Sequence, residues 1–386
     1  MKRRDVLISG AAVATGAGVV GALASDGNIA RSRPSANRET TSPGSAAPNV
    51  IRGLKRFRMA TSWPKNFPGL GIMPERFAES LNRISDGTIE VQVFAAGELV
   101  GATEVFDACQ TGAVDMYHAA EYYWQGKSKA FNFFTAVPNG MTASEIMGWI
   151  DYGGGQELWN ELSNSFNIQA FQAGNTGHQT GGWFRREMKS LEDFRGLKIR
   201  MPGLGGEVVR RMGGSAVRLA GGEIYQSLQS GAIDATEWVG PWNDLALGFY
   251  REAPYYYSPG FHEPGASLSV GVNLQVWESL TPAEQEMVRI SCKAANDASL
   301  GEYTFMNAQA LKTLRTEHQI VPRSFGEDVL VAIGRIAEDV VAELASADSM
   351  TSRIFQSYKA TRDAMRGWTE ISDGAFIAAR KAALDS

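Results

Sequence analysis

The stretch Leu197-Lys-Ile-Arg200 has the pattern of a short strand, and Met201-Pro-Gly-Leu-Gly-Gly206 directly after it has the pattern of a helix start. Ile233-Asp-Ala-Thr-Glu-Trp238 predicts the next strand. Strands that alternate with helices are typical of α/β sheets, which bind ligands at the carboxyl ends of their strands. Arg200 and Glu237 are both expected at such ends.

Two arrangements of Arg200 and Glu237 fit the sequence. Either they form a plain salt bridge, or they flank a small anion, with Glu237 holding a cation on the other side of that anion. A carboxylate beside a bound anion is unfavourable unless a positive charge lies between them. The planar guanidinium of an arginine suits bidentate binding of a carboxylate. We therefore favour the second arrangement, with an organic acid as the anion.

The same order of elements occurs a second time, earlier in the chain. Thr111-Gly-Ala-Val-Asp115 and Ser230-Gly-Ala-Ile-Asp234 each lie between a helical pattern and a strand pattern. This repeat predicts two related α/β lobes with mostly parallel sheets. Residues 267–274 alternate as a strand that suits a crossing between the lobes. A capping box at Thr281-Pro-Ala-Glu284 opens a helical pattern that continues to about Glu317, which predicts a long helix spanning the hinge.

The N-terminal residues have the features of an export signal. Arg3 and Arg4 precede an Ala/Gly-rich run that ends near Ala24, which favours the twin-arginine route over an uncleaved membrane anchor. The polar residues that follow predict a flexible leader, and the mature protein is expected in the periplasm. The predicted division is an export signal at 1–24, a flexible leader at 25–52, lobe I at 53–175 plus about 263–303, lobe II at 176–262 plus about 304–350, and C-terminal dimerisation helices at 351–386.

The composition argues against several classes of protein. The 386 residues carry a net charge of -5 without a long run of one sign, so no basic face for nucleic acid is expected. Two cysteines, Cys109 and Cys292, are too few for a disulfide framework, and two buried thiols are favoured over a single bridge. The four histidines form no paired-ligand spacing, and neither a nucleophile elbow nor a Walker loop occurs.

Several ordered motifs resemble one known family. Ala95-Ala-Gly-Glu-Leu-Val-Gly101 and Thr111-Gly-Ala-Val-Asp-Met116 resemble the extracytoplasmic binding proteins of TRAP transporters, the tripartite ATP-independent periplasmic systems. Gly174-Asn-Thr-Gly-His-Gln-Thr-Gly-Gly-Trp-Phe184, Ala220-Gly-Gly-Glu-Ile-Tyr225 and Ala235-Thr-Glu-Trp-Val-Gly-Pro241 are similar to the branch that binds 2-oxo acids with sodium. The resemblance covers nearly all of the chain after the leader.

The resemblance implies an α/β, two-lobed periplasmic-binding-protein-like fold with a long hinge-spanning helix and a C-terminal dimerisation helix exchanged in a homodimer. It places Arg200 at the carboxylate-binding arginine of the family. Gln179, Glu237 and Trp238, the last through its backbone carbonyl, fall at positions that hold the metal and the acid together. Few charged ligands and a neutral amide favour Na+, with Ca2+ as the second candidate.

Other residues are weaker ligand candidates. Tyr122 follows a strand of the first lobe, so its hydroxyl is expected to close over the ligand from the opposite lobe. Asn175 and Trp242 are also candidates, although a turn amide explains Asn175 and a core aromatic explains Trp242. Read alone, Gln179 is equally well explained as a satisfied core amide. Phe184 is better explained as a core aromatic.

The expected function is that of a periplasmic substrate-binding protein of a TRAP-type transporter. It would capture a small 2-oxo monocarboxylate, pyruvate-like, with a cation by cleft closure, and deliver the acid to the membrane permease. We expect no enzyme, because only His178 among the histidines joins the core motif and it is expected to point away. Two alternatives stay open: a metal-assisted lyase acting on the same acids, and a sensory receptor for organic acids.

Overall fold

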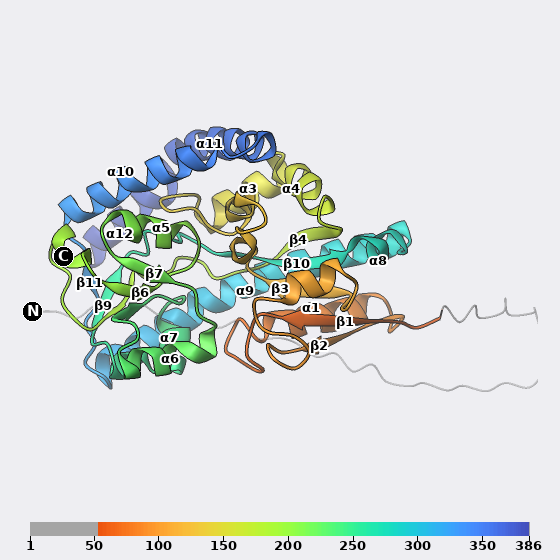
Figure 1. Cartoon of the computed structure of the whole chain (residues 1–386), viewed down its shortest axis with the longest axis horizontal. Coiled ribbons are helices and arrows are strands. Elements are labelled where there is room, and N and C mark those ends of the chain that lie inside the picture. Colours follow the sequence, from red (N-terminus) through yellow and green to blue (C-terminus); the bar gives the residue numbers. More distant parts are fainter. Residues whose placement is uncertain (1–52, 386) are drawn as a thin grey trace, which may run out of the picture. The chain divides into compact units, whose positions relative to one another are not determined.

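The first of two sheets has the strand order β2-β1-β3-β10-β4 in the computed structural model, which describes residues 53–385 (Figure 1). β1 runs parallel to β2 and β3, whereas β10 is antiparallel to both of its neighbours. The strands are β1 (Lys55–Thr61), β2 (Ile89–Phe94), β3 (Met116–Ala119), β4 (Ile168–Asn175) and β10 (Ser267–Asn273).

The second sheet has the order β11-β9-β5-β8-β6-β7. β6 is parallel to β7 and β8, and β5 is antiparallel to β8 and β9. The strands are β5 (Gly182–Phe184), β6 (Lys198–Arg200), β7 (Ser215–Val217), β8 (Ala235–Thr236), β9 (Tyr255–Ser258) and β11 (Arg323–Ser324).

Helices connect the strands and continue after the last one. The α-helices are α1 (Met73–Ile84), α2 (Val105–Gln110), α3 (Ala143–Tyr152), α4 (Gly155–Asn164), α5 (Gly203–Arg211), α6 (Gly221–Ser230), α7 (Pro241–Leu247), α8 (Leu274–Glu278), α9 (Pro282–Thr316), α10 (Glu327–Leu344), α11 (Ser349–Thr369) and α12 (Ala375–Leu384). The short 3-10 helices are η1 (Glu121–Trp124), η2 (Lys129–Phe134), η3 (Leu191–Phe194) and η4 (Phe249–Arg251), and the π-helical turn η5 (Glu370–Gly374) joins α11 to α12.

The long helix α9 begins as its capping box predicts. The carboxylate of Glu284 accepts a hydrogen bond from the backbone N–H of Thr281 at 2.7 Å, and the hydroxyl of Thr281 accepts one from the N–H of Glu284 at 3.3 Å. α9 packs against α1 and β4, which belong with the first sheet, and against α7, which follows a strand of the second. The predicted two-lobed α/β fold with a long helix along both halves is confirmed (Figure 1).

Two strand predictions were wrong in detail. Residues 267–274 are predicted to cross between lobes, but β10 lies inside the first sheet with all seven of its residues buried. Because β10 is antiparallel to its neighbours, and β5 likewise, the sheets are mixed rather than mostly parallel. The strand predicted at 233–238 is reduced to the two residues of β8, because the chain turns towards α7 at once.

Three connections carry the chain between the sheets: from β4 to β5, from β9 to β10, and from β10 through α8 and α9 to β11. Thr176 lies in the first connection and Ala266 in the second. The backbone N–H of Thr176 donates to the carbonyl of Ala266 at 3.1 Å, so the two connections are paired side by side. This pairing holds the two connections together where they pass between the sheets.

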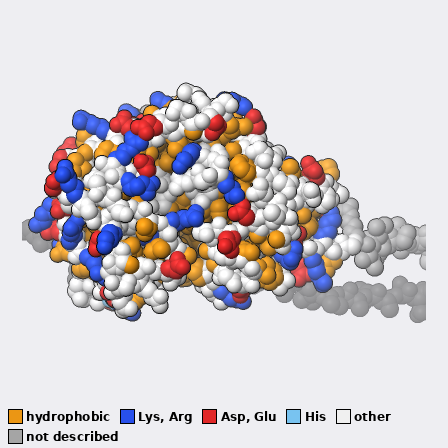
Figure 2. Space-filling model, viewed as in Figure 1, with side chains coloured by type: hydrophobic (Ala, Val, Ile, Leu, Met, Phe, Trp, Pro, Cys, Tyr) orange, Lys and Arg blue, Asp and Glu red, His pale blue; other side chains and the backbone are white. Residues whose placement is uncertain are grey.

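Several other expectations concern the chain as a whole. Cys109 and Cys292 are both free and buried, as predicted. No helix among the described residues is long and apolar enough to cross a membrane. Acidic and basic side chains are interspersed on the face shown in Figure 2. The export signal predicted at 1–24 and the leader predicted at 25–52 lie outside the described residues.

Candidate functional site

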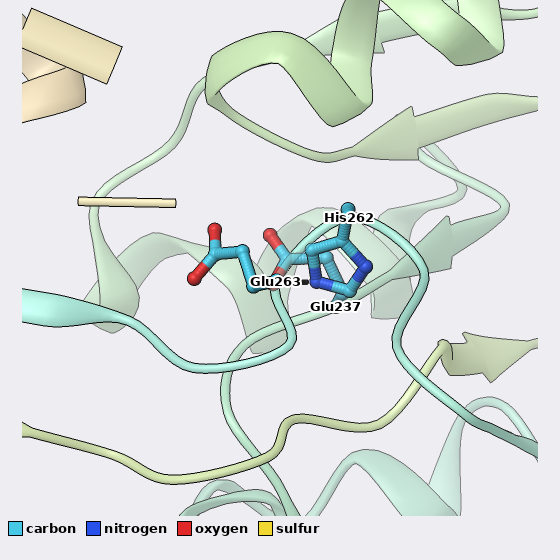
Figure 3. A group of neighbouring side chains, drawn as sticks. All are labelled: Glu237, His262 and Glu263. Carbon is cyan, nitrogen blue, oxygen red and sulfur yellow. Dashed lines mark hydrogen bonds and ion pairs between the residues drawn. The ribbon is translucent and has the colours of Figure 1, made fainter. Parts of the chain in front are cut away.

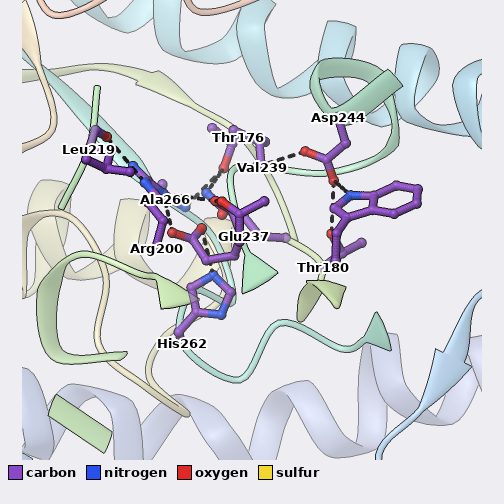
Figure 4. Close-up of polar contacts among 12 residues, drawn as sticks. Thr176, Thr180, Arg200, Leu219, Glu237, Val239, Asp244, His262 and Ala266 are labelled. Carbon is purple, nitrogen blue, oxygen red and sulfur yellow. Dashed lines mark hydrogen bonds and ion pairs between the residues drawn. The ribbon is translucent and has the colours of Figure 1, made fainter. Parts of the chain in front are cut away.

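Arg200 ends β6 with its guanidinium pointing into the protein, and its side chain is 1% exposed. Its Nη1 donates to the backbone carbonyl of Glu237 at 3.0 Å and also to the carboxylate of Glu237 (Figure 4). Its Nε donates to the carbonyl of Leu219 at 3.4 Å. Burial by itself would lower the pKa of Arg200, but the charge of Glu237, together with Tyr123, Tyr122 and Glu263, raises the pKa overall. The guanidinium is therefore a charged group held in one orientation.

Glu237 also belongs to a buried group of three side chains with His262 and Glu263, shown in Figure 3. The other oxygen of its carboxylate lies 3.1 Å from Nε2 of His262. Glu263 lies beside them, and the three residues offer ligand atoms that all lie within 4.8 Å of one another. Burial, then the charge of Glu237, raises the pKa of Glu263 to about 7. Burial lowers the pKa of His262, but the charge and hydrogen bond of Glu237, together with the charge of Glu263, leave the pKa raised.

The carboxylate of Glu237 thus lies between the guanidinium of Arg200 and the imidazole of His262. Arg200 and Glu237 pair directly here, which is the first of the two arrangements that fit the sequence. A buried charge must be paired, so each side chain supplies the partner that the other requires. If an acid and a cation bind between Arg200 and Glu237, the acid must take the place of Glu237 beside the guanidinium. The cation must then take the place of Arg200 beside the carboxylate.

Gln179 lies in the connection between β4 and β5 and is 5% exposed. Its backbone N–H donates to the carbonyl of Glu263 at 3.4 Å, and its side-chain Nε2 donates to the hydroxyl of Thr176 at 3.2 Å. Its Oε1 is buried and has no hydrogen-bond partner within residues 53–385. A buried amide oxygen without a partner is unusual and is the kind of ligand that a hard cation takes.

A small cavity lies where these residues meet. Its walls come from both halves of the fold: Trp63, Leu70, Tyr122, Tyr123, Thr176, Gln179, Arg200, Trp238, Val239, Ala266 and Leu268. The centre of a water molecule can occupy about 10 Å³ of it, which is room for about one water. An organic acid would therefore enter only when the walls move apart.

Tyr122 and Trp238 both line this cavity. Tyr122 lies in η1, after the first sheet's β3, and burial together with the charge of Glu263 raises the pKa of its hydroxyl well above the usual range. Trp238 follows β8 of the second sheet, with the Cζ of Arg200 4.8 Å from the centre of its ring. Its indole Nε1 is buried without a partner in the described part of the chain.

Asn175, Trp242 and Phe184 are not among the cavity walls. The Oδ1 of Asn175 accepts from the N–H of Gly177 at 2.8 Å, which is the turn amide that the sequence offered as the alternative. Trp242 packs its ring 5.2 Å from that of Tyr303 in α9. Phe184 is buried in the hydrophobic core. His178 is exposed and, as expected, points away.

The sequence analysis missed other residues at the site. Trp63 lies just beyond the carboxyl end of β1, so the rule that applies to strand ends could have found it. Its indole donates to Nδ1 of His118 at 2.8 Å. His262 and Glu263 lie in a loop between β9 and β10, and no periodic pattern marks them.

A wider cavity of about 450 Å³ lies elsewhere, among α3, α4, β4 and α9. Its Gln156 and Gln169 amides both donate to Oδ1 of Asn160, so they are already satisfied. None of the residues that line it forms a buried pair of arginine and carboxylate like that of Arg200 and Glu237. Size alone therefore does not make it the better candidate for binding a small acid.

Comparisons with known proteins agree with this geometry. Residues 59–348 match the family of bacterial extracellular solute-binding proteins, family 7 (DctP). The chain is 39% identical, over 97% of both chains, to a monocarboxylate 2-oxoacid-binding periplasmic protein of a Nostoc species. A TRAP periplasmic solute-binding protein of Pseudoalteromonas atlantica, solved with sodium and pyruvate, is 38% identical, with a TM-score of 0.82 over 84% of this chain and 99% of that one.

A third similar protein was solved with a different cation. The TRAP periplasmic solute-binding protein of Colwellia psychrerythraea, with bound calcium and pyruvate, is 37% identical, with a TM-score of 0.82 over 84% of this chain and 99% of that one. The match to the family model and the identity to these relatives extend over most of the chain. This chain belongs to the DctP family of bacterial extracellular solute-binding proteins.

Proposed function

We propose that this chain is the periplasmic receptor of a TRAP-type transporter, that it binds a small 2-oxo monocarboxylate such as pyruvate together with a cation, and that it delivers the acid to a membrane permease. The observation that carries the proposal is the buried guanidinium of Arg200 beside the unpartnered oxygen of Gln179, at a cavity between the two halves of the fold. The similar proteins solved with pyruvate and either sodium or calcium support the choice of ligand.

Arg200 would bind the carboxylate of the acid through its planar fork. The cation would take the side-chain oxygen of Gln179, the carboxylate of Glu237 and the backbone carbonyl of Trp238, with the acid supplying its remaining ligands. All of these are oxygens, which suits Na+ or Ca2+. The bound cation would supply the positive charge that lets Glu237 remain beside an anion.

Tyr122 would close the cavity from the first lobe through its hydroxyl. We assign Asn175 and Trp242 supporting positions next to the site, because the first holds the turn at Gly177 and the second packs on α9. The proposed lobes are 53–175 plus about 263–303 and 176–262 plus about 304–350. The strands of each sheet all fall within the corresponding lobe, β10 included.

Release and capture require the lobes to separate and close. Contacts that join the lobes here include the guanidinium of Arg218, which donates to the carbonyl of Tyr123 at 2.6 Å. The amide of Asn243 donates to the carbonyl of Pro68 at 2.8 Å. Binding of the acid and cation would shift the population towards this closed arrangement.

Calorimetric titration with a panel of acids tests the proposal. Protein is first unfolded, refolded and desalted in the presence of chelator to remove bound acid and cation. Pyruvate and other short 2-oxo acids are expected to bind only after sodium or calcium is added, while acetate and succinate bind much more weakly. Tight binding of none of the 2-oxo acids, with the refolded protein intact by circular dichroism, would overturn the proposal.

Product analysis distinguishes the receptor function from an enzymatic one. The Arg200, Glu237 and cation set could polarise an oxo group, so a lyase acting on the same acids is the alternative to exclude. Incubation of the protein with pyruvate and cation, followed by product analysis, is expected to return the acid unchanged. Turnover above a heat-inactivated control would favour the lyase.

Export and assembly complete the proposal. Residues 1–24 would direct export by the twin-arginine route, and a lysine pair in place of Arg3 and Arg4 should retain the precursor in the cytoplasm. The C-terminal helices would hold a homodimer by exchange with a second copy. Exposed apolar side chains along this tail support that role: Trp368, Ile371, Phe376, Ile377 and Leu384.

A further inference from the structure

Thr176 lies beside Gln179 in the connection between β4 and β5 and is 1% exposed. Its hydroxyl makes three hydrogen bonds, and one of the partners, Ala266, is labelled beside Thr176 in Figure 4. It donates to the carbonyl of Gly177 at 3.0 Å, accepts from the backbone N–H of Ala266 at 3.2 Å, and accepts from Nε2 of Gln179 at 3.2 Å.

These three contacts use the full capacity of the hydroxyl. A threonine hydroxyl has one proton to donate and two lone pairs to accept with. The proton goes to the carbonyl of Gly177, and one lone pair goes to a backbone N–H that can only donate. The remaining lone pair can be satisfied only by the nitrogen of the Gln179 amide, because the amide oxygen would face an oxygen without a proton.

The orientation of the Gln179 amide follows from this. With its nitrogen turned towards Thr176, its Oε1 must point the other way, where it is buried without a partner among the described residues. Gln179 and Thr176 both line the cavity together with Arg200. The unpartnered Oε1 of Gln179 is thus available to coordinate a cation.

We propose that Thr176 is a positioning residue that turns the oxygen of Gln179 towards the bound cation. The inference deepens the proposed function and rests on it, because it concerns the ligand set of the same cation. A flipped amide would present two N–H donors to the cation and would repel it. Because its hydroxyl is fully used by these three contacts, Thr176 would act on the cation through Gln179.

The same hydroxyl also belongs to the hinge. Thr176 exchanges two hydrogen bonds with Ala266: its N–H donates to the Ala266 carbonyl, and its hydroxyl accepts from the Ala266 N–H. Because these residues lie in two of the three connections between the sheets, the Gln179 amide is oriented from the hinge. The orientation of the Gln179 oxygen is therefore set before the lobes close.

Two substitutions of Thr176 separate the hydroxyl from the shape of the side chain. In chelated protein at fixed pyruvate, the readout is the sodium concentration at half-saturation, with calcium in a parallel series. Thr176→Val keeps the shape and should raise that concentration roughly 10- to 100-fold, as is typical when a residue that orients a metal ligand is lost. Thr176→Ser keeps the hydroxyl and should stay within about twofold of the parent, because the same three contacts remain possible.

A double-mutant cycle distinguishes positioning from general stability. Gln179→Glu replaces the amide with a carboxylate, which presents an oxygen to the cation whichever way it is turned. In that background, Thr176→Val should change the half-saturating sodium concentration by less than about threefold, because no orientation needs to be chosen. An equally large effect in both backgrounds would show that Thr176 acts on the fold, and the inference would be overturned.

The failure of the inference differs from the failure of the proposed function. If parent protein binds pyruvate equally well at every sodium and calcium concentration, the cation is not part of the site and both are overturned. If the parent requires the cation and Thr176→Val requires no more of it, only the role of Thr176 is overturned. Should Thr176→Val not fold, Thr176→Ala takes its place in the same cycle, since it leaves room for a water at the Ala266 N–H.

Discussion

The guanidinium of Arg200 lies over the indole ring of Trp238, with its Cζ 4.8 Å from the ring centre, while its Nη1 donates to Glu237. A planar cation held on one face by an aromatic ring and at one edge by a carboxylate keeps its orientation as well as its charge. Lysine at this position would keep only the charge.

Arg200→Lys is therefore expected to weaken pyruvate binding roughly 10- to 100-fold, because a hydrogen bond to a charged group contributes roughly 1.5–3 kcal/mol. Calorimetric titration at saturating cation measures the loss. Arg210→Lys is the matched control, since Arg210 is exposed on α5 and pairs with Glu207. Parent-like affinity of the Arg200 variant would show that Arg200 is not the carboxylate ligand.

Glu237→Gln should act mainly through the cation. The substitution removes a negative ligand while keeping the side-chain shape, so the half-saturating sodium concentration should rise by roughly tenfold or more. Titration with sodium at fixed pyruvate measures the change. Glu286→Gln serves as the control, because Glu286 is exposed on α9 and pairs only with Arg289. A cation requirement that is the same in the parent and in Glu237→Gln would contradict the ligand role.

Tyr303→Phe should loosen the contact between α7 and the first lobe. The hydroxyl of Tyr303 donates to Oδ1 of Asn243 at 2.7 Å, and this leaves the Asn243 nitrogen facing the carbonyl of Pro68. Loss of one buried hydrogen bond costs roughly 1 kcal/mol, which corresponds to about fivefold in affinity. We expect faster pyruvate dissociation in stopped-flow measurements and little change in association. A slower or unchanged dissociation rate would show that the Asn243 contact does not hold the closed form.

The stability of the protein should fall as the pH rises from about 4.5 to about 7. Burial raises the pKa of Glu121 from 4.5 to about 7, and its Oε1 accepts from the hydroxyls of Tyr117 and Ser269. Between these pH values the Glu121 carboxyl has lost its proton in the unfolded chain and still holds it in the folded chain. Folding therefore becomes less favourable as the pH rises.

Glu121→Gln should remove this part of the pH dependence. The carboxyl group can contribute at most about 3 kcal/mol over this window, at 1.36 kcal/mol for each pKa unit. Urea unfolding at pH 5 and pH 8 measures it, and the variant is expected to lose less stability between the two than the parent. Equal losses would show that Glu121 titrates normally in the fold.

The C-terminal tail offers a test of assembly. Phe376→Ser combined with Ile377→Ser removes two exposed apolar side chains from α12. If the proposed homodimer forms through this tail, the parent should sediment as a dimer and the double variant as a monomer. Tyr152→Ser is the control, because Tyr152 is also exposed and apolar but lies in α3. A dimer that survives the double substitution would mean that this tail does not form the interface.

Local sequence patterns predicted the long elements better than the short ones. The capping box at Thr281 and the periodic residues after it predicted α9 nearly to its last residue, because capping and helical periodicity are local. β10 was found but misplaced. Its burial on both faces and its antiparallel pairing depend on strands far away in the sequence, which no window of neighbouring residues contains.

The residues of the site also differ in whether local sequence predicts them. Arg200 and Glu237 could be named because they stand at strand ends, and Gln179 because it lies within a motif that resembles a known family. His262 could not, since it comes from a loop and reaches Glu237 only through the fold. The roles of Asn175 and Trp242 were open between ligand and support, and only coordinates show that a turn and an aromatic contact occupy them.

Cys109 and Cys292 remain separate thiols, and burial raises the pKa of both well above the usual range. A protein without a cross-link to close needs no oxidant to mature, so it can reach its final form in a reducing cytosol. Thiols kept in the protonated state also react slowly with alkylating reagents. Material prepared under dithiothreitol throughout should bind its ligand as well as material prepared in air, and both should resist iodoacetamide until they are denatured.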